Sequence, residues 1–498
     1  MRAELGAFAA DGVLALAGLC ILWGLGVLGR SARSFLAALG LAYLTGSAVV
    51  CVALIALLSA GAPFGVTTFL GVAALCVVAG LGAGLRREGN ARPRLPRLHL
   101  RVPAAPRLRG RSLGWWITAI FVVLFGVYAL VGLLNALLLP LDQQDAWSIW
   151  TRKAQLLTVN DTLPSEFFTS ESYAFMHPDY PLLLPVWEAL HFRTAGRIDT
   201  QAVHAHLWLL LPAFVGAAAY LVRDVMGPLI WAPILLGVGA APGVWQQLLW
   251  AFADLPMALF AGVGALCLGL WLTRGRGSDL VLSGVMLAAA ASTKNEGLMS
   301  AAALLLVAAI VVLATRRSQA LPFARRRSEA LPSTRGRSQA LGLGLTALGV
   351  VVALLPWRIW MAAHGVAGEL PVLKGLDPGY LLDRTERVMP AVRAINAQLA
   401  RQEQWVYLVP LAVLVAGASL VAGVNRRAAA LYLGAGAIMW GLLVWAYWIY
   451  PLDLTFLLTT SPDRVITGLI FVCVAAVLHL TGGLAALAAR TWADPRGR

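Results

Sequence analysis

The chain has 498 residues, of which 59% are hydrophobic and 13% are charged, and its mean hydropathy is +0.76. A soluble domain of this size cannot bury so much apolar surface, so the composition predicts a polytopic membrane protein. The net charge of +15 does not indicate a nucleic-acid-binding protein, because the basic residues lie in short segments between apolar runs.

Apolar runs of membrane-spanning length follow one another along the whole chain. A spanning helix needs about 20 mainly apolar residues, and by that criterion the sequence predicts a bundle of about thirteen transmembrane helices. The stretch from 228 to 273 reads as a tight hairpin or as a differently broken pair. The predicted spans are 12–29, 35–59, 64–84, 115–140, 202–222, 228–249, 251–273, 279–293, 297–315, 340–360, 405–424, 428–449 and 465–489.

Arginine-rich segments set the predicted orientation. The linkers 85–113 and 316–339 are both rich in arginine, and the second repeats a unit of about ten residues, which is typical of a low-complexity connector. The positive-inside rule places both linkers in the cytoplasm, the N-terminus outside and the C-terminus inside. The loops 141–201 and 361–404 are then exterior.

The first arginine-rich linker is also the main predicted boundary. Segment 85–114 separates N-terminal spans within 1–84 from a membrane domain over 115–498. The first apolar run lacks the features of a cleaved signal peptide, so we expect it to be retained. The five cysteines all lie inside apolar runs, which predicts neither a disulfide framework nor a cysteine metal site.

The first exterior loop opens with Asp142 and Asp145 directly after a span. Tryptophans and aliphatic residues then alternate with polar ones, including Lys153, at helical spacing. This pattern predicts an amphipathic helix in the membrane interface, with Lys153 on its polar face. Two interpretations of the acids remain open. They cap the helix and favour its dipole, or they face the same way and serve in catalysis.

Four further polar clusters adjoin apolar runs on the predicted exterior side. His177-Pro-Asp179-Tyr180-Pro begins a stretch in which a proline starts a helix that runs through Leu182 to Phe192, and Asp254 lies in a later turn. Lys294-Asn-Glu296 either forms a plain turn or points both charges inward toward a ligand. Arg464 either extends to the membrane interface or binds a phosphate with two hydrogen bonds.

These phrases resemble the GT-C superfamily of integral membrane glycosyltransferases, in the branch of protein O-mannosyltransferases and lipid A aminoarabinose transferases. The similarity covers roughly 115–480. It rests on Asp145-Ala-Trp-Ser-Ile-Trp-Thr-Arg-Lys, His177-Pro-Asp-Tyr-Pro-Leu-Leu, Ala253-Asp254-Leu-Pro and Thr293-Lys-Asn-Glu-Gly297. The chain departs from the family in having Asp-Ala-Trp where many members have Asp-Glu, and its three N-terminal spans have no counterpart in the family's minimal core.

The resemblance implies transfer of a sugar from a polyprenyl-phosphate donor to an envelope glycan, lipid or protein on the exterior face. An inverting transfer needs a carboxylate as general base, and Asp145 with Asp142 are the catalytic candidates. The sequence requires no cofactor, and it neither requires nor excludes the divalent metal that some members bind. Besides donor and acceptor, we expect membrane lipid as a partner and no nucleic acid. The candidate substrate-binding residues are Lys153, His177, Asp179, Tyr180, Asp254, Lys294, Glu296 and Arg464.

Two other classes of protein compete with this interpretation. A transporter or flippase of lipid-linked sugars would place polar residues within the membrane. The sequence shows no matched pair of broken helices in two halves, and its charges lie at one interface. A polysaccharide polymerase or ligase of another fold would share both the lipid donor and the exterior site.

Overall fold

The computed structural model describes residues 2–29, 31–88, 113–320 and 332–493. Helices joined by short connections make up these residues, and no strand occurs among them. The all-α prediction is therefore confirmed for the described chain.

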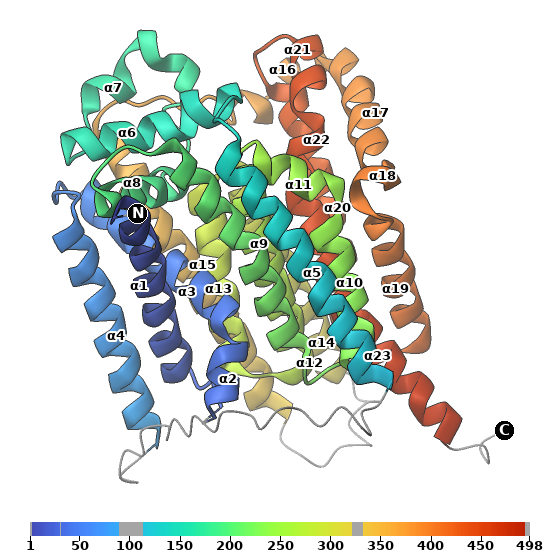
Figure 1. Cartoon of the computed structure of the whole chain (residues 1–498). Helices are drawn as coiled ribbons and strands as arrows, with labels where there is room; N and C mark the ends of the chain where they lie inside the picture. The colour runs from blue at the N-terminus through green and yellow to red at the C-terminus, as the bar shows by residue number, and fades with distance from the viewer. Residues whose placement is uncertain (1, 30, 89–112, 321–331, 494–498) are drawn as a thin grey trace.

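Ten helices in the described part of the chain are long and apolar enough to cross a membrane, which makes the protein a multi-pass membrane protein. They run side by side as one bundle (Figure 1). They are α1 (Arg2–Gly24), α3 (Leu39–Ser59), α4 (Val66–Glu88), α5 (Leu113–Leu138), α9 (Thr200–Val222), α12 (Asp254–Arg274), α14 (Asn295–Ala320), α15 (Pro332–Ala363), α20 (Arg426–Ile449) and α23 (Thr467–Ala493).

The other predicted spans coincide with shorter or broken helices. Helices α10 (Pro228–Ala240) and α11 (Pro242–Leu249) meet at an angle of 49°, so the predicted span 228–249 is broken near its middle. Ala241 is extended there, with φ −62° and ψ 123°, as expected for a residue before proline. Helices α13 (Gly277–Thr293) and α19 (Leu408–Ala422) are apolar but short. The predicted count of thirteen therefore stays a prediction.

Most short helices gather at one end of the bundle, which we call the loop end and define as residues 141–199, 364–407 and 450–465. The N-terminus lies toward this end and the C-terminus at the other (Figure 1), whereas α2 (Ala32–Ala37) lies near the opposite end. The loop-end elements are η1 (Ala146–Trp150), α6 (Thr151–Asn160), α7 (Ser165–Thr169), η2 (Glu171–Met176), α8 (Leu183–Ala195), η4 (Lys374–Leu376), α16 (Pro378–Leu382), η5 (Thr385–Arg387), α17 (Val388–Leu399), α18 (Gln402–Trp405), α21 (Leu454–Thr460) and α22 (Pro462–Val465).

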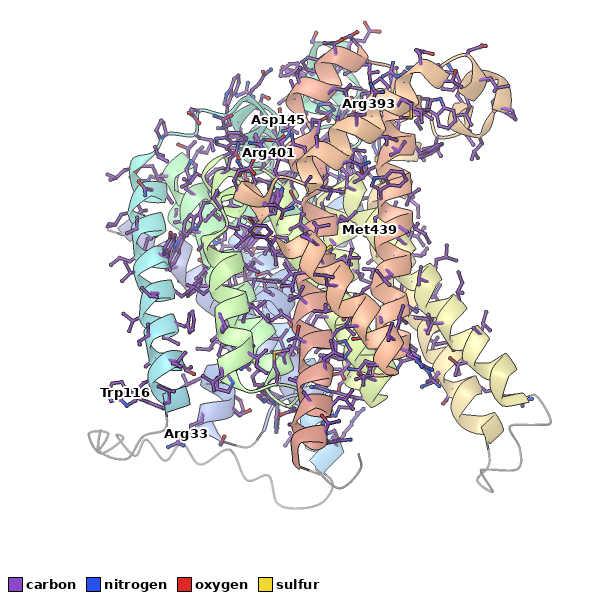
Figure 2. All side chains as sticks on the ribbon, turned by 90° about the vertical axis from the view of Figure 1, so that its right-hand side faces the viewer. Arg33, Trp116, Asp145, Arg393, Arg401 and Met439 are labelled. Carbon is purple, nitrogen blue, oxygen red and sulfur yellow. The ribbon has the colours of Figure 1, made fainter. Side chains whose placement is uncertain are left out.

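The two ends of the bundle carry different side chains. Asp145, Arg393 and Arg401 lie at the loop end, and Arg33 and Trp116 lie at the opposite end (Figure 2). Most of the linkers 85–113 and 316–339, which carry the orientation argument, lies outside the described residues. Which end faces the cytoplasm therefore stays a prediction.

Helix α12 forms the centre of the bundle. Its spanning stretch is 100% buried, and it packs against α9, α13, α14, α20 and α23. By contrast, the spanning stretches of α5 and α15 are only 6% and 17% buried. Their apolar side chains are suited to contact lipid, because no water-soluble surface could be so apolar.

The N-terminal helices share this core instead of forming a core of their own. Helix α1 packs against α3, α4 and α8, and α3 packs against α9, α13 and α15. A Cβ atom on Gly46 would lie 1.8 Å from the carbonyl oxygen of Leu14, so glycine permits the close approach of α3 to α1. The predicted boundary at 85–114 thus separates segments of sequence but not separate cores.

Candidate functional site

An ion pair joins two of the predicted site residues across most of the chain. Asp145 lies just before η1, and Arg464 lies on the single turn of α22. The Nη1 atom of Arg464 donates a hydrogen bond to the Oδ2 atom of Asp145. The guanidinium also lies 4.7 Å from the centroid of the Phe252 ring. This packing and pairing hold Arg464 inside the loop end, which does not fit an arginine that only extends to the membrane surface.

Lys294 lies at the break between α13 and α14, where the backbone is extended. Its side chain points inward, because Nζ lies 2.6 Å from Oδ1 of Asp254 and 3.1 Å from Oε1 of Glu296. The side chains of Lys294 and Asp254 are 7% and 2% exposed. Of the two interpretations of Lys294 and Glu296, the structure thus supports the inward one. Burial lowers the pKa of Lys294, but the Asp254 and Glu296 carboxylates outweigh it and hold the pKa above its ordinary value.

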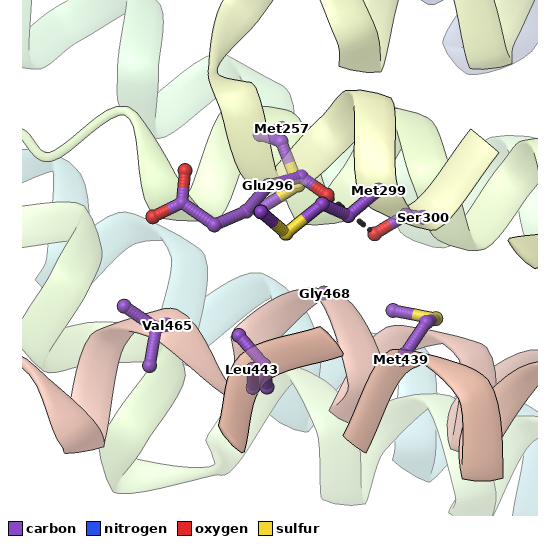
Figure 3. Close-up of a pocket in the computed structure, with 8 residues that line it drawn as sticks. All are labelled: Met257, Glu296, Met299, Ser300, Met439, Leu443, Val465 and Gly468. Atoms are coloured by element: carbon purple, nitrogen blue, oxygen red, sulfur yellow. Dashed lines mark hydrogen bonds between the residues drawn. The ribbon is translucent and has the colours of Figure 1, made fainter. Parts of the chain in front are cut away.

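Glu296 also borders an apolar crevice between α12, α14, α20 and the start of α23 (Figure 3). Its empty volume, with the open space at its mouth included, is about 240 Å³. One lining residue, Val465, follows Arg464 directly in the chain. The remaining lining residues are Met257, Met299, Ser300, Met439, Leu443 and Gly468. The charged group of Glu296 thus adjoins a surface suited to an apolar chain.

A second buried lysine, Lys153, lies on α6, and no carboxylate among the described residues forms an ion pair with it. Its side chain is 0% exposed, and Nζ donates a 2.6 Å hydrogen bond to the carbonyl oxygen of His177. The same atom lies 5.8 Å and 5.7 Å from the ring centroids of Trp150 and Tyr180. Burial lowers the pKa of Lys153 to about 7, although Asp179 and Glu369 act in the opposite direction.

The His177–Tyr180 segment forms a compact network around Glu369. His177 Nδ1 lies 2.6 Å from Oε2 of Glu369, and the His177 ring stacks on Tyr180 with 4.6 Å between centroids. The backbone N–H of Glu369 donates to Oδ2 of Asp179 at 3.2 Å. Burial raises the pKa of Asp179. His177 has φ 48°, a left-handed conformation that a non-glycine residue adopts at a cost of roughly 1 kcal/mol.

Asn295 connects the two lysine networks. Its Nδ2 atom lies 3.5 Å from Oδ2 of Asp179, and its Oδ1 atom accepts a 3.0 Å hydrogen bond from Arg358. Asn295 lies between Lys294 and Glu296 in the chain. The predicted clusters at 177–180 and 294–296 therefore meet through one amide.

Three sequence predictions need correction or refinement here. Lys153 is buried, not on a polar helix face, because it lies on the side of α6 that also buries Ala154 and Leu157. The helix predicted through Leu182 to Phe192 is α8, which begins at Leu183 after the chain turns through His177 and Pro181. Asp142 is exposed and precedes the helical residues, so it does not share a helix face with Asp145.

The sequence analysis did not single out Glu369, Asn295 or Arg358 as site residues. Glu369 lies in a long connection after α15, where an isolated acid gives no periodic or spacing signal. Asn295 lies within the Thr293–Gly297 phrase, but only its charged neighbours Lys294 and Glu296 were chosen as candidate site residues. Arg358 lies within an apolar run, and a charged residue in such a run could have been recognised as a candidate site residue.

Searches for relatives identify no family for this chain. No protein-family model, no curated protein and no solved structure matches it.

Proposed function

We propose that the loop end is the active site of a glycosyltransferase that takes a sugar from a polyprenyl-phosphate donor and passes it to an envelope glycan, lipid or protein. The ion pair between Asp145 and Arg464 carries this proposal. It brings a carboxylate and a guanidinium from positions 319 residues apart to one place beside Lys294, Asp254 and Glu296. The architecture that would suit this function is a GT-C-like bundle.

The cations are placed to hold the donor phosphate. Arg464 uses Nη1 for Asp145, whereas its Nε atom is buried and makes no hydrogen bond to the described residues. A phosphate can take that free donor together with a neighbouring N–H in two parallel bonds. The apolar crevice that begins at Glu296 and Val465 offers a surface for the first part of the lipid chain. A lipid-linked donor needs both features at one place.

Asp145 is the proposed general base. Phosphate bound through the other donors of Arg464 shares the guanidinium charge, and the acceptor hydroxyl or amine approaches Asp145. Asp145 then accepts the proton of the acceptor hydroxyl or amine as that group bonds to the anomeric carbon. The bond from that carbon to the phosphate oxygen breaks, and the lipid phosphate leaves with the electron pair, stabilised by Arg464 and Lys294.

Asp145→Asn and Asp142→Asn form a matched pair that tests the function. Each is expressed in cells that lack the protein, and envelope glycans are analysed by mass spectrometry. We expect Asp145→Asn to lower transfer by about 10²–10⁴-fold, because the amide keeps shape but accepts no proton. Asp142→Asn should transfer at a near-normal rate, because Asp142 is exposed. Normal transfer by Asp145→Asn would overturn its role, and glycans unchanged when the protein is removed would overturn the function.

The proposed site must also face the exterior. Single cysteines at Thr169, which lies at the loop end, and at Ser333, which begins α15, test this in a background without native cysteines. A membrane-impermeant thiol reagent added to intact cells should label Thr169→Cys and leave Ser333→Cys unlabelled. The reverse pattern would place the loop end in the cytoplasm and remove the exterior site.

A further inference from the structure

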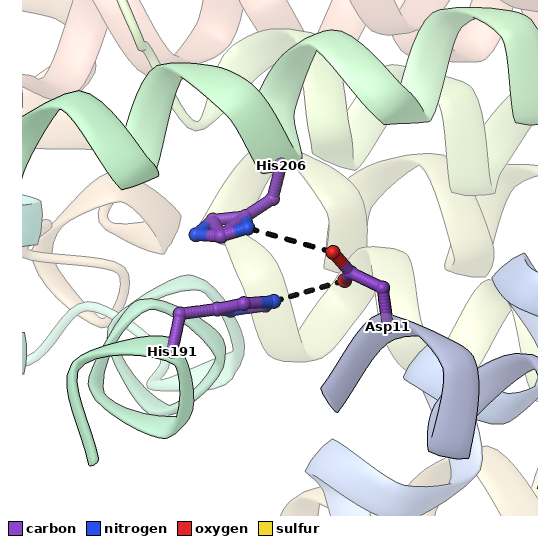
Figure 4. A group of neighbouring side chains, drawn as sticks. All are labelled: Asp11, His191 and His206. Carbon is purple, nitrogen blue, oxygen red and sulfur yellow. Dashed lines mark hydrogen bonds and ion pairs between the residues drawn. The ribbon is translucent and has the colours of Figure 1, made fainter. Parts of the chain in front are cut away.

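Three buried side chains from separate elements meet near the start of the chain (Figure 4). Asp11 comes from α1, His191 from α8 and His206 from α9, and they are 5%, 0% and 4% exposed. His191 Nε2 lies 2.9 Å from Oδ1 of Asp11, and His206 Nδ1 lies 3.8 Å from Oδ2. None of the three belongs to the proposed glycosyltransferase site, and a buried carboxylate at this depth needs a cationic partner.

The hydrogen bonds around His191 determine which of its nitrogens carries a proton. Its Nδ1 atom lies 2.8 Å from the carbonyl oxygen of Trp187, which can only accept, so Nδ1 donates. In neutral His191, Nε2 then holds a lone pair that faces an acceptor oxygen of Asp11. The hydroxyl of Tyr43 already donates to that same oxygen at 2.8 Å. Two facing acceptors need a cation between them.

The close second histidine excludes a proton on both rings. The rings of His191 and His206 stack with their centroids 3.2 Å apart. Two imidazolium ions so close would repel each other in a buried site. A single divalent ion, however, takes two neutral imidazoles and one carboxylate at once. It satisfies both nitrogens that face Asp11 and balances the buried carboxylate.

We propose that Asp11, His191 and His206 bind a zinc-class divalent metal ion. The candidate ligand atoms of the three residues lie within 4.8 Å of one another. Ligands placed about 2.0–2.1 Å from a tetrahedral ion lie roughly 3.3 Å apart, between the 2.9 Å and 3.8 Å separations of the two histidine nitrogens from Asp11. Trp187 and Tyr43 supply the outer hydrogen bonds that orient ligands in such sites.

The ion would fasten the N-terminal helix to the helices that carry the loop end. Helix α8 follows the His177–Tyr180 segment directly, and α9 follows α8. A bond from Asp11 to both histidines fixes α1 against these two elements. The metal therefore has a structural role, and its presence does not depend on which reaction the loop end performs.

Metal content and thermal stability test the site directly. The protein is purified without a polyhistidine tag, equilibrated with Zn²⁺, and freed of loosely bound metal before elemental analysis. We expect about one equivalent of zinc in the wild type, and a loss of most of it in His206→Gln and Asp11→Asn. His204→Gln is the matched control, because His204 is also buried on α9 but is not one of the three ligands. It should keep the wild-type amount.

The wild-type protein alone gives a second measurement, which holds even if a variant fails to fold. Chelation should lower the thermal midpoint in detergent by several degrees, and added Zn²⁺ should restore it where Mg²⁺ does not. Zinc retained by His206→Gln at the wild-type amount would overturn the ligand assignment. Wild-type protein that holds no zinc and shows no shift on chelation would overturn the metal site and leave an ion pair between Asp11 and a protonated histidine.

Discussion

The candidate site contains two buried lysines whose surroundings differ in charge. Lys294 lies within 3.1 Å of two carboxylates, Asp254 and Glu296. Lys153 donates to a backbone carbonyl and is flanked by aromatic rings. The pKa of the first is raised and that of the second is lowered to about 7.

The comparison separates a permanent charge from one that changes near neutral pH. Lys294 must stay protonated, because Asp254 and Glu296 would otherwise be buried without a counter-ion. Lys153 can lose its proton and still donate a hydrogen bond to His177. Burial alone therefore does not fix the role of a lysine. The nearest acceptor, a carboxylate or a carbonyl, decides it.

The largest expected effect comes from making the same substitution at both lysines. Lys294→Met leaves two carboxylates without their cation, and removal of one partner from a buried pair costs about 3–5 kcal/mol. Lys153→Met should change stability far less at neutral pH, because it removes a hydrogen bond but also the burial of a charge. Thermal midpoints in detergent measure both.

The exposed Lys374 supplies the control for that pair. Lys374→Met should leave the midpoint unchanged. In addition, Asp254→Asn should recover part of the loss in Lys294→Met, because it removes one of the unpaired charges. Equal losses in Lys294→Met and Lys153→Met would show that the two sites do not differ as the contacts indicate.

A smaller effect is expected at Arg464, which is the other cation beside Lys294 in the proposed site. Arg464→Lys keeps the charge but loses the planar pair of donors, so donor saturation should need about tenfold more substrate. Arg464→Ala should bind the donor more weakly still. If Arg464→Lys saturates like the wild type, bidentate phosphate binding is wrong, and wild-type behaviour of Arg464→Ala would remove Arg464 from the site.

Much of the fold could be predicted from the sequence, because a bilayer requires long apolar runs. Each predicted span coincides with a helix or with the broken pair α10 and α11. Pro242 is the sequence feature that could have predicted the break between α10 and α11. Asp11, however, lies at the edge of an apolar run, where a single acidic residue is expected at the boundary of a span. The sequence therefore did not predict its contact with His191 and His206.

The candidate site was predictable as a set of residues but not as a set of contacts. Polar residues beside apolar runs gave Arg464 and Lys294, since such positions fall at one surface. Their pairing with Asp145 and Asp254 depends on how helices far apart in the sequence pack together. The spacing of residues in a single sequence does not predict that packing. Lys153 was placed on a polar face because of its charge, although its position in α6 puts it on the same side as the buried Ala154 and Leu157.

Glu369 should show a modest effect within the Lys153 network. Glu369→Gln removes the charge that faces Nδ1 of His177 at 2.6 Å. We expect a loss of about 1–2 kcal/mol in stability, the size of a charge-assisted hydrogen bond. Thermal midpoints in detergent measure the loss, with Glu171→Gln, an exposed acid at the same end, as the control. An unchanged midpoint in Glu369→Gln would show that this contact does not stabilise the segment.

The smallest effect concerns the pH dependence that Lys153 gives to stability. Its pKa falls from 10.5, the ordinary value in the unfolded chain, to about 7 in the folded protein. Between these values the unfolded chain binds more protons, so the contribution of Lys153 to stability rises with pH from about 7 to 10.5. The slope is at most about 1.4 kcal/mol per pH unit. His177, Asp179 and Glu369 face the same amine network.

Thermal midpoints of the wild type and of Lys153→Met, measured from pH 7 to pH 10, isolate this contribution. Groups common to both proteins cancel in the difference, which should move in favour of the wild type as pH rises. Lys294 contributes with the opposite sign, since its raised pKa gives stability that is complete below 10.5 and is lost above it. A difference that stays flat across the range would mean that Lys153 is charged in the folded protein, and the contrast between the two lysines would then rest on their hydrogen-bond partners alone.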